Sequence, residues 1–202
     1  MEQYETWRIN NHDVEFFDDS HTYLVDGVIV PSVTTILKKK FGNKYSVVPK
    51  ATLEKASQLG IQMHLAIQEY EEQGKDCELK ELRNYKFLKK QYKWECLANE
   101  VPVILFLNTE PIACGRVDMI GSMDGQTGIF DFKRVSTLDK DYLALQLNLY
   151  RIAYCQSYGI VADFLRGIHL REDVRKFVTI PVNEQMTWQF LKEWMEGKDG
   201  KD

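Results

Sequence analysis

Two neighbouring apolar segments of this chain carry charged residues where a buried β-strand normally carries none. Asp118 lies in the first segment, and Asp131 and Lys133 lie in the second. Side chains alternate between the faces of a strand, so Asp131 and Lys133 share one face, and Phe130 and Phe132 point from the other face into the core. A short Gly-rich polar stretch separates the segments and predicts a hairpin that brings Asp118 close to the other two charged residues.

Two carboxylates held this close repel each other unless a cation or a proton lies between them. Hard divalent cations prefer oxygen ligands such as carboxylates. We therefore expect Asp118 and Asp131 to bind Mg²⁺ or Mn²⁺, with the ammonium group of Lys133 beside the metal.

Two predicted helices, one before these strands and one after them, carry further polar residues. Apolar residues recur with helical spacing around His64, namely Leu59, Met63, Ile67 and Tyr70. The later helix is outlined by Tyr142, Leu145, Leu149 and Ile152. It also carries Gln146 and Tyr150, which project from one face because they are four residues apart.

In this order, the residues resemble the PD-(D/E)XK nuclease superfamily, in which an acid on one strand and acid-x-lysine on the next build a magnesium site for phosphodiester hydrolysis. The G-x-x-x-H pattern ending at His64 and the Q-x-x-x-Y pattern of Gln146 and Tyr150 resemble its RecB-like exonuclease branch. Segments 21–27 and 30–37 resemble the amino-terminal signature of small phage exonucleases and of the mitochondrial genome maintenance exonuclease. Asp26-Gly27 is also typical of a tight hairpin turn and Ser32 of a helix cap, and a role of both segments as scaffold alone is the alternative.

The resemblance implies a metal site and a catalytic group. Asp118, Asp131, His64 and the backbone carbonyl of Phe132 would bind Mg²⁺ or Mn²⁺, and imidazole as a ligand favours Mn²⁺. The metal would polarise the phosphate and lower the pKa of bound water. Lys133 would orient that water and stabilise the developing negative charge, so Asp118, Asp131 and Lys133 are the expected catalytic residues.

Other residues are expected to contact DNA or to support the site. The resemblance implies that Gln146 and Tyr150 position Lys133 and a DNA phosphate. Arg116 is either part of a structural ion pair or a phosphate contact. Glu100 resembles the acid that opens the first core strand in relatives, and an exposed carboxylate at a strand end is the alternative.

The composition favours one domain in a reducing compartment. The 202 residues are 44% hydrophobic, and no Pro/Gly/Ser-rich linker divides them. We expect a single domain over residues 1–196 and a flexible tail over 197–202. The chain has no apolar run of membrane-spanning length, and its amino terminus is neither basic nor apolar, so we expect a cytoplasmic protein of a bacterium or phage-infected cell that is not secreted and binds no membrane.

The four cysteines are isolated from one another, which favours neither a zinc site nor a disulfide framework. Some nucleases with similar motifs hold an iron–sulfur cluster with three cysteines that follow the core. Because no cysteine follows Cys155, we expect no such cluster.

The net charge of −4 is unfavourable for a nucleic-acid partner, but the basic residues are clustered. The first cluster is formed by Lys38, Lys39, Lys40, Lys44, Lys50 and Lys55, and the second by Lys80, Arg83, Lys86, Lys89, Lys90 and Lys93. Either cluster could contact DNA, and a solvated helix face is the alternative.

The predicted fold is α/β, with a restriction-endonuclease-like core in which helices flank a mixed central β-sheet. We expect a β-hairpin over 14–30, helices over 33–41, 50–73 and 79–98, strands over 101–107, 112–121 and 127–134, a helix over 139–158, strands over 162–170 and 174–180, and a helix over 184–196. The hairpin and helices of 14–98 would precede a catalytic core over 99–182.

These features predict a metal-dependent nuclease whose partner is DNA, either single-stranded or at duplex ends. The helical region 49–97 is large enough to cover the site, which favours a threaded strand and therefore an exonuclease. An endonuclease is the alternative, as is a non-catalytic nucleic-acid-binding or interaction module.

Overall fold

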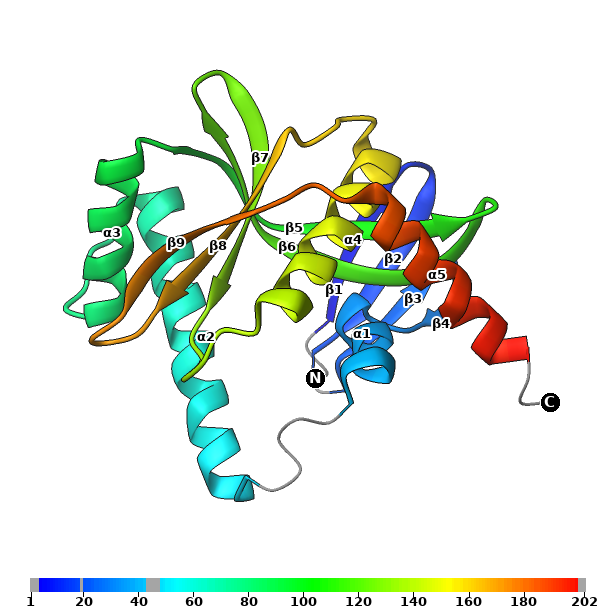
Figure 1. The fold of residues 1–202 in the computed structure, drawn as a ribbon, viewed down its shortest axis with the longest axis horizontal. Coiled ribbons are helices and arrows are strands. Elements are labelled where there is room, and N and C mark those ends of the chain that lie inside the picture. Colours follow the sequence, from blue (N-terminus) through cyan, green and yellow to red (C-terminus); the bar gives the residue numbers. More distant parts are fainter. Residues whose placement is uncertain (1–3, 19, 43–47, 200–202) are drawn as a thin grey trace.

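The computed structural model describes residues 4–18, 20–42 and 48–199 of the chain and contains two β-sheets and five helices within them (Figure 1). The elements are β1 (Tyr4–Ile9), β2 (His12–Phe17), β3 (Thr22–Val25), β4 (Val28–Val30), α1 (Val33–Phe41), α2 (Lys50–Gln73), α3 (Lys80–Tyr92), β5 (Glu95–Leu107), β6 (Glu110–Met123), β7 (Gln126–Lys133), α4 (Lys140–Tyr158), β8 (Phe164–Leu170), β9 (Arg175–Ile180) and α5 (Glu184–Asp199).

The amino-terminal sheet is antiparallel with the order β1-β2-β3-β4, so it is larger than the predicted hairpin. Asp26 and Gly27 form the tight turn between β3 and β4, and both have positive φ angles, as this dipeptide predicts. The prediction missed β1. Its turn into β2 is made by Asn10 and Asn11, whose side chains tolerate the left-handed backbone that the turn requires.

The second sheet has the order β5-β6-β7-β8-β9 and is mixed. Strands β5, β6 and β7 form an antiparallel meander, β8 runs parallel to β7 after the crossover through α4, and β9 is antiparallel to β8. The turn between β6 and β7 is made by Asp124 and Gly125 at positive φ, so this connection is the predicted hairpin.

Helices cover both faces of the second sheet. One buried cluster joins the sheet to α1, α4 and α5, and another joins it to α2 and α3. The amino-terminal sheet packs against the β5–β6 hairpin through a third cluster. The predicted fold class, α/β with helices around a mixed sheet, is confirmed.

The last turn of α4 supplies hydrogen-bond partners to the backbone groups on the outer edge of β5. The side chain of Gln156 accepts a hydrogen bond from the Phe106 backbone N–H and donates one to its carbonyl. Ser157 does the same at Ile104, and the Tyr158 hydroxyl donates to the carbonyl of Pro102. Three consecutive helical residues thus pair with alternate residues of an edge strand that would otherwise expose unpaired groups.

Two predicted helix ends were wrong. Helix α3 ends at Tyr92 because Lys93 adopts a left-handed conformation, and the residues from Glu95 onward belong to β5. Helix α5 continues to Asp199, three residues past its predicted end at 196, and residues 200–202 lie outside the described part of the chain.

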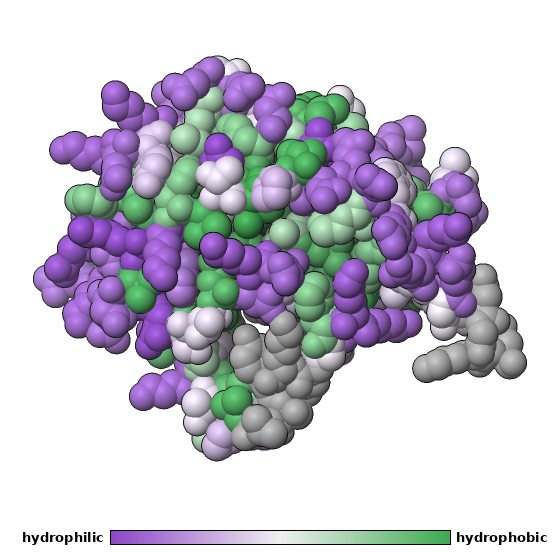
Figure 2. Space-filling view, viewed as in Figure 1, coloured by the Kyte–Doolittle hydropathy of each residue, from purple (hydrophilic) through white to green (hydrophobic). Residues whose placement is uncertain are grey.

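Polar side chains cover the two ends of the molecule on the face shown in Figure 2, over α3 and over α5, and apolar side chains are visible between them. None of the described helices has both the length and the apolar character of a bilayer-spanning segment.

Candidate functional site

Strands β6 and β7 separate at the predicted charged residues. Their pairing ends with Met119 opposite Phe130, one residue short of Asp118 and Asp131. Beyond that point Asp118 Oδ2 accepts a hydrogen bond of 2.6 Å from the Phe132 backbone N–H. A side chain therefore replaces main-chain pairing, and the two carboxylates lie where the strands diverge.

Asp131 and Lys133 form an ion pair on one face of β7, as their alternation predicts. Lys133 Nζ lies 2.9 Å from Asp131 Oδ1 and 2.7 Å from Oδ2. Asp131 is only 2% exposed and is as buried as Phe130 and Phe132 on the opposite face. Both faces of this strand are therefore covered.

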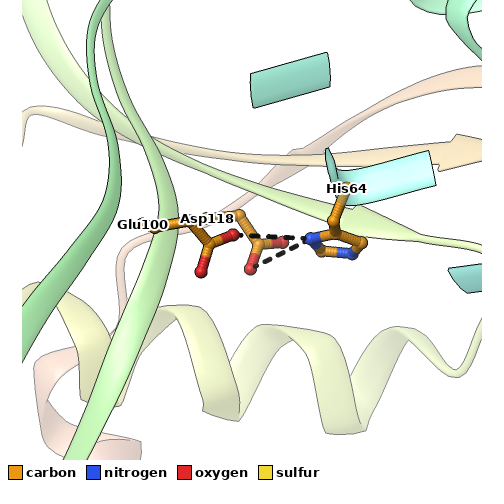
Figure 3. Close-up of side chains that lie close together, drawn as sticks. All are labelled: His64, Glu100 and Asp118. Atoms are coloured by element: carbon orange, nitrogen blue, oxygen red, sulfur yellow. Dashed lines mark ion pairs between the residues drawn. The ribbon is translucent and has the colours of Figure 1, made fainter. Parts of the chain in front are cut away.

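His64 reaches the two strands from α2. Its Nε2 atom lies 3.2 Å from the carbonyl oxygen of Phe132. Its Nδ1 atom lies 3.8 Å from Asp118 Oδ1 and 3.8 Å from Glu100 Oε1, and the three side chains point toward one another (Figure 3). One donor atom from each of His64, Glu100 and Asp118 lies within 4.8 Å of the others, a grouping that could hold a metal ion.

Glu100 is the member of this group that the sequence left open between two alternatives. It lies in β5, in the register next to Asp118, because Asn99 pairs with Met119 and Val101 with Val117. Its φ angle is +47°, a left-handed conformation that is uncommon for a non-glycine residue and costs free energy within a strand. Such outliers cluster at functional sites, and here the backbone conformation accompanies a carboxylate aimed at the cluster.

The charges of the site perturb one another strongly. Burial alone lowers the pKa of His64, but Asp118 and Glu100 outweigh it and raise the pKa to about 9. Burial raises the pKa of Asp131 to about 6, against the effect of Lys133 and with that of Asp118. Burial also raises the pKa of Asp118, which means that the site disfavours its carboxylates in the ionised form.

The remaining predicted residues border the same cluster. Arg116 Nη1 pairs with Glu5 Oε1 at 3.0 Å, so the structural ion pair is present, and its guanidinium carbon lies 4.7 Å from the centre of the Phe16 ring. Tyr150 is buried and passes close to Gly115, where a Cβ atom would lie 2.8 Å from the tyrosine ring. Gln146 is also buried, one turn earlier on α4.

These residues line one cleft of about 870 Å³. Its walls include residues of β2 and the β2–β3 turn (Phe16, Asp18 and His21), the start of α1 (Ser32 and Thr34), and one face of α2 (Ser57, Gly60, Ile61, His64, Leu65 and Gln68). His64, Glu100, Arg116, Asp118, Asp131, Lys133, Gln146 and Tyr150 all contribute to it.

No described residue of either basic cluster lines the cleft. In the second, on α3, Lys80, Lys86 and Lys89 pair with acidic residues, and no α3 residue is among the described residues that line the cleft. The expectation that both helices of 49–97 cover the site is therefore wrong for α3, which packs on α2 and on β8 and β9 instead. In the first cluster, Lys39 and Lys40 lie over aromatic rings of α5, and Lys44 lies outside the described residues.

Comparisons with known proteins identify no family. No family model matches the chain, and no curated protein matches it. Among solved structures, the chain is similar to the crystal structure of SSO0001, with 15% sequence identity and a TM-score of 0.46 over 83% of this chain and 75% of that chain. Neither an activity nor a family follows from a similarity at this level.

Proposed function

We propose that the protein is a Mg²⁺- or Mn²⁺-dependent deoxyribonuclease, with exonuclease action on free DNA ends favoured over endonuclease action. One observation carries the proposal: the His64, Glu100 and Asp118 group lies in the same cleft as the ion pair of the buried Asp131 and the partly buried Lys133. Processing of recombining, damaged or phage DNA in the cytoplasm of a bacterium or phage-infected cell is the role that we expect.

The donor set fits a divalent cation. It offers two carboxylates and one imidazole within 4.8 Å. Asp131, which the sequence also predicted as a ligand, lies outside this group and pairs with Lys133. The raised pKa values of Asp118 and Asp131 reflect carboxylates that need positive charge beside them. The side chains of this group would hold the metal. The Phe132 carbonyl, whose oxygen lies 3.2 Å from His64 Nε2, would be a further ligand.

The chemistry would be attack of water on a phosphodiester. A bound metal supplies polarisation of the phosphate and a lowered pKa for water. Lys133 orients the water and stabilises negative charge on the phosphate, and Asp131 holds the Lys133 ammonium in place through its two carboxylate oxygens. Gln146 and Tyr150 lie on the α4 side of this pair and position the DNA phosphate.

The first experiment measures hydrolysis of linear DNA by the purified protein with Mn²⁺ and with excess chelator. We expect cleavage only with metal, and loss of at least about a hundredfold in rate for Asp131→Ala and Lys133→Ala. Lys176→Ala, on the exposed part of β9, is the matched control and should leave the rate unchanged. Undiminished cleavage in chelator would overturn the metal mechanism.

The second experiment measures Mn²⁺ binding by calorimetry. His64→Ala and Glu100→Gln should each weaken binding by roughly tenfold or more, because each removes one ligand, and DNA binding should remain. His12→Ala is the control, since His12 pairs with Asp26 in the amino-terminal sheet. Titrations identical to that of the unmodified protein would assign the cluster to ion pairing alone and favour the non-catalytic alternative.

A further inference from the structure

A second cavity, the side cavity, adjoins the cleft beyond Lys133. It has a volume of about 270 Å³ and lies between α1, the segment 134–139 that follows β7, and α4. Thr34, Lys133 and Gln146 line both the cleft and the side cavity. A strand that passes the metal group would therefore reach this cavity directly after Lys133.

The side cavity is lined by the apolar and aromatic side chains of Phe41, Val135, Leu138 and Tyr142, together with polar residues that include Lys133 and Asp139. The Phe41 and Tyr142 rings pack edge to face with their centres 5.3 Å apart. Lys38, one helical turn after Thr34 on α1, also lines the cavity and places a positive charge beside these rings. Aromatic faces next to a cation suit a group that is flat and apolar on one side and anionic on the other.

Gln146 supplies an independent observation. Its side chain is 4% exposed and forms a hydrogen bond with Tyr150. Its Oε1 atom is buried, and no hydrogen-bond partner for it is found within the described residues. A buried acceptor without a donor is uncommon in folded proteins, and Gln146 lines both the cleft and the side cavity, so a bound group with an N–H donor that reaches this side chain would satisfy it.

We propose that the side cavity binds the nucleobase of the nucleotide that lies on the Lys133 side of the scissile phosphate. This inference rests on the proposed nuclease function and extends it to a base-binding subsite. The base packs against the Phe41 and Tyr142 rings, Gln146 Oε1 accepts a hydrogen bond from an N–H group of the base, and Lys38 faces the phosphate of the same nucleotide. Stacking tolerates every base, so the subsite selects a base-bearing nucleotide rather than a sequence.

The first test is direct binding of 2-aminopurine deoxyriboside 5′-monophosphate, followed by its fluorescence in the presence of chelator. Phe41→Leu and Tyr142→Leu should each weaken binding by about five- to tenfold, because each removes one stacking surface. Phe87→Leu is the matched control, since Phe87 is a half-exposed phenylalanine of α3 outside both hollows. Equal affinity in all three variants, or no binding by the unmodified protein, would overturn the proposal.

The second test measures DNA cleavage and distinguishes a failure of the proposed base-binding subsite from a failure of the proposed nuclease function. A linear oligonucleotide whose terminal nucleotide lacks its base should be cut about tenfold more slowly than the complete oligonucleotide, and Tyr142→Leu should reduce this difference. Equal rates on both oligonucleotides would overturn the subsite and leave the nuclease intact. Failure to cut either one would overturn the nuclease, while the binding test decides separately whether the cavity holds a base.

Discussion

At the scale of single residues, His64 balances the acids of the site. Its Nδ1 atom faces both Glu100 and Asp118, and their charges raise its pKa to about 9. In the absence of metal the ring is therefore protonated near neutral pH and partly neutralises the two carboxylates. Metal binding must displace this proton, so the same side chain couples the protonation of the site to its loading.

This coupling predicts how the metal-free protein responds to pH. The pKa of His64 rises from its ordinary 6.5 to about 9 on folding, so the folded state binds more protons between these values. The resulting stabilisation is full below pH 6.5 and is lost as the pH rises through 9, with an upper limit of about 3 kcal/mol that solvent screening of this partly exposed side chain reduces.

Denaturant unfolding in chelator at pH 6.5 and 9 measures the effect. The free energy of unfolding should fall with pH more steeply in the unmodified protein than in His64→Gln, which keeps a polar side chain but does not titrate. Equal slopes for both proteins would contradict the predicted protonation of His64.

The sequence predicted the positions of Asp118, Asp131 and Lys133 well, because strand alternation and a Gly-containing turn determine which side chains meet. It left Glu100 undecided. The place of that carboxylate depends on a left-handed backbone conformation inside β5, and no local sequence pattern indicates it. The near-complete burial of Asp131 could not be predicted from the sequence either, because it depends on the packing around β7.

At the scale of elements, the last turn of α4 supplies hydrogen-bond partners to β5, the edge strand of the second sheet. The amide of Gln156 makes both a donor and an acceptor contact with the backbone of Phe106. Because β5 carries Glu100, this helix-to-strand contact also fixes the strand that presents one ligand of the proposed metal. The order of the helices and of the strands of the second sheet was predictable from periodicity, but this long-range pairing was not, because the partners are fifty residues apart.

Gln156→Leu tests this contact. The substitution leaves the N–H and carbonyl of Phe106 without partners at a partly buried position, which should lower the free energy of unfolding by about 1–3 kcal/mol. Gln189→Leu is the matched control because Gln189 donates a hydrogen bond to Glu193 on the exposed face of α5, and it should change stability by less than about 0.5 kcal/mol. Equal stability of the two variants in denaturant titrations would show that water replaces the hydrogen bonds of Gln156 without lowering the free energy of unfolding.

At the scale of the whole molecule, the cleft is built from segments far apart in the chain. The amino-terminal sheet supplies one wall, α2 another, and β6, β7 and α4 the floor with the charged residues. On α2, Ile61 and Leu65 are largely exposed at the cleft although they are apolar, and Gly60 beside them leaves open space where a side chain would lie. An apolar lip beside a charged floor suits a DNA strand whose bases are unpaired.

This arrangement carries the last prediction, which concerns the form of the substrate. The cleft continues past Lys133 into the side cavity, whose volume of about 270 Å³ is far smaller than the 870 Å³ of the cleft. A strand that must place its terminal nucleotide there has to enter by a free end.

Linear single-stranded DNA should therefore be degraded at least about tenfold faster than a circle of the same sequence, measured with Mn²⁺ by following product lengths over time. The linear substrate is this circle opened at one position, so the two substrates differ only in their ends, and short products should appear from the end of the linear form before internal fragments do. Rapid nicking of the intact circle would contradict end entry, and the endonuclease alternative would then describe this site better.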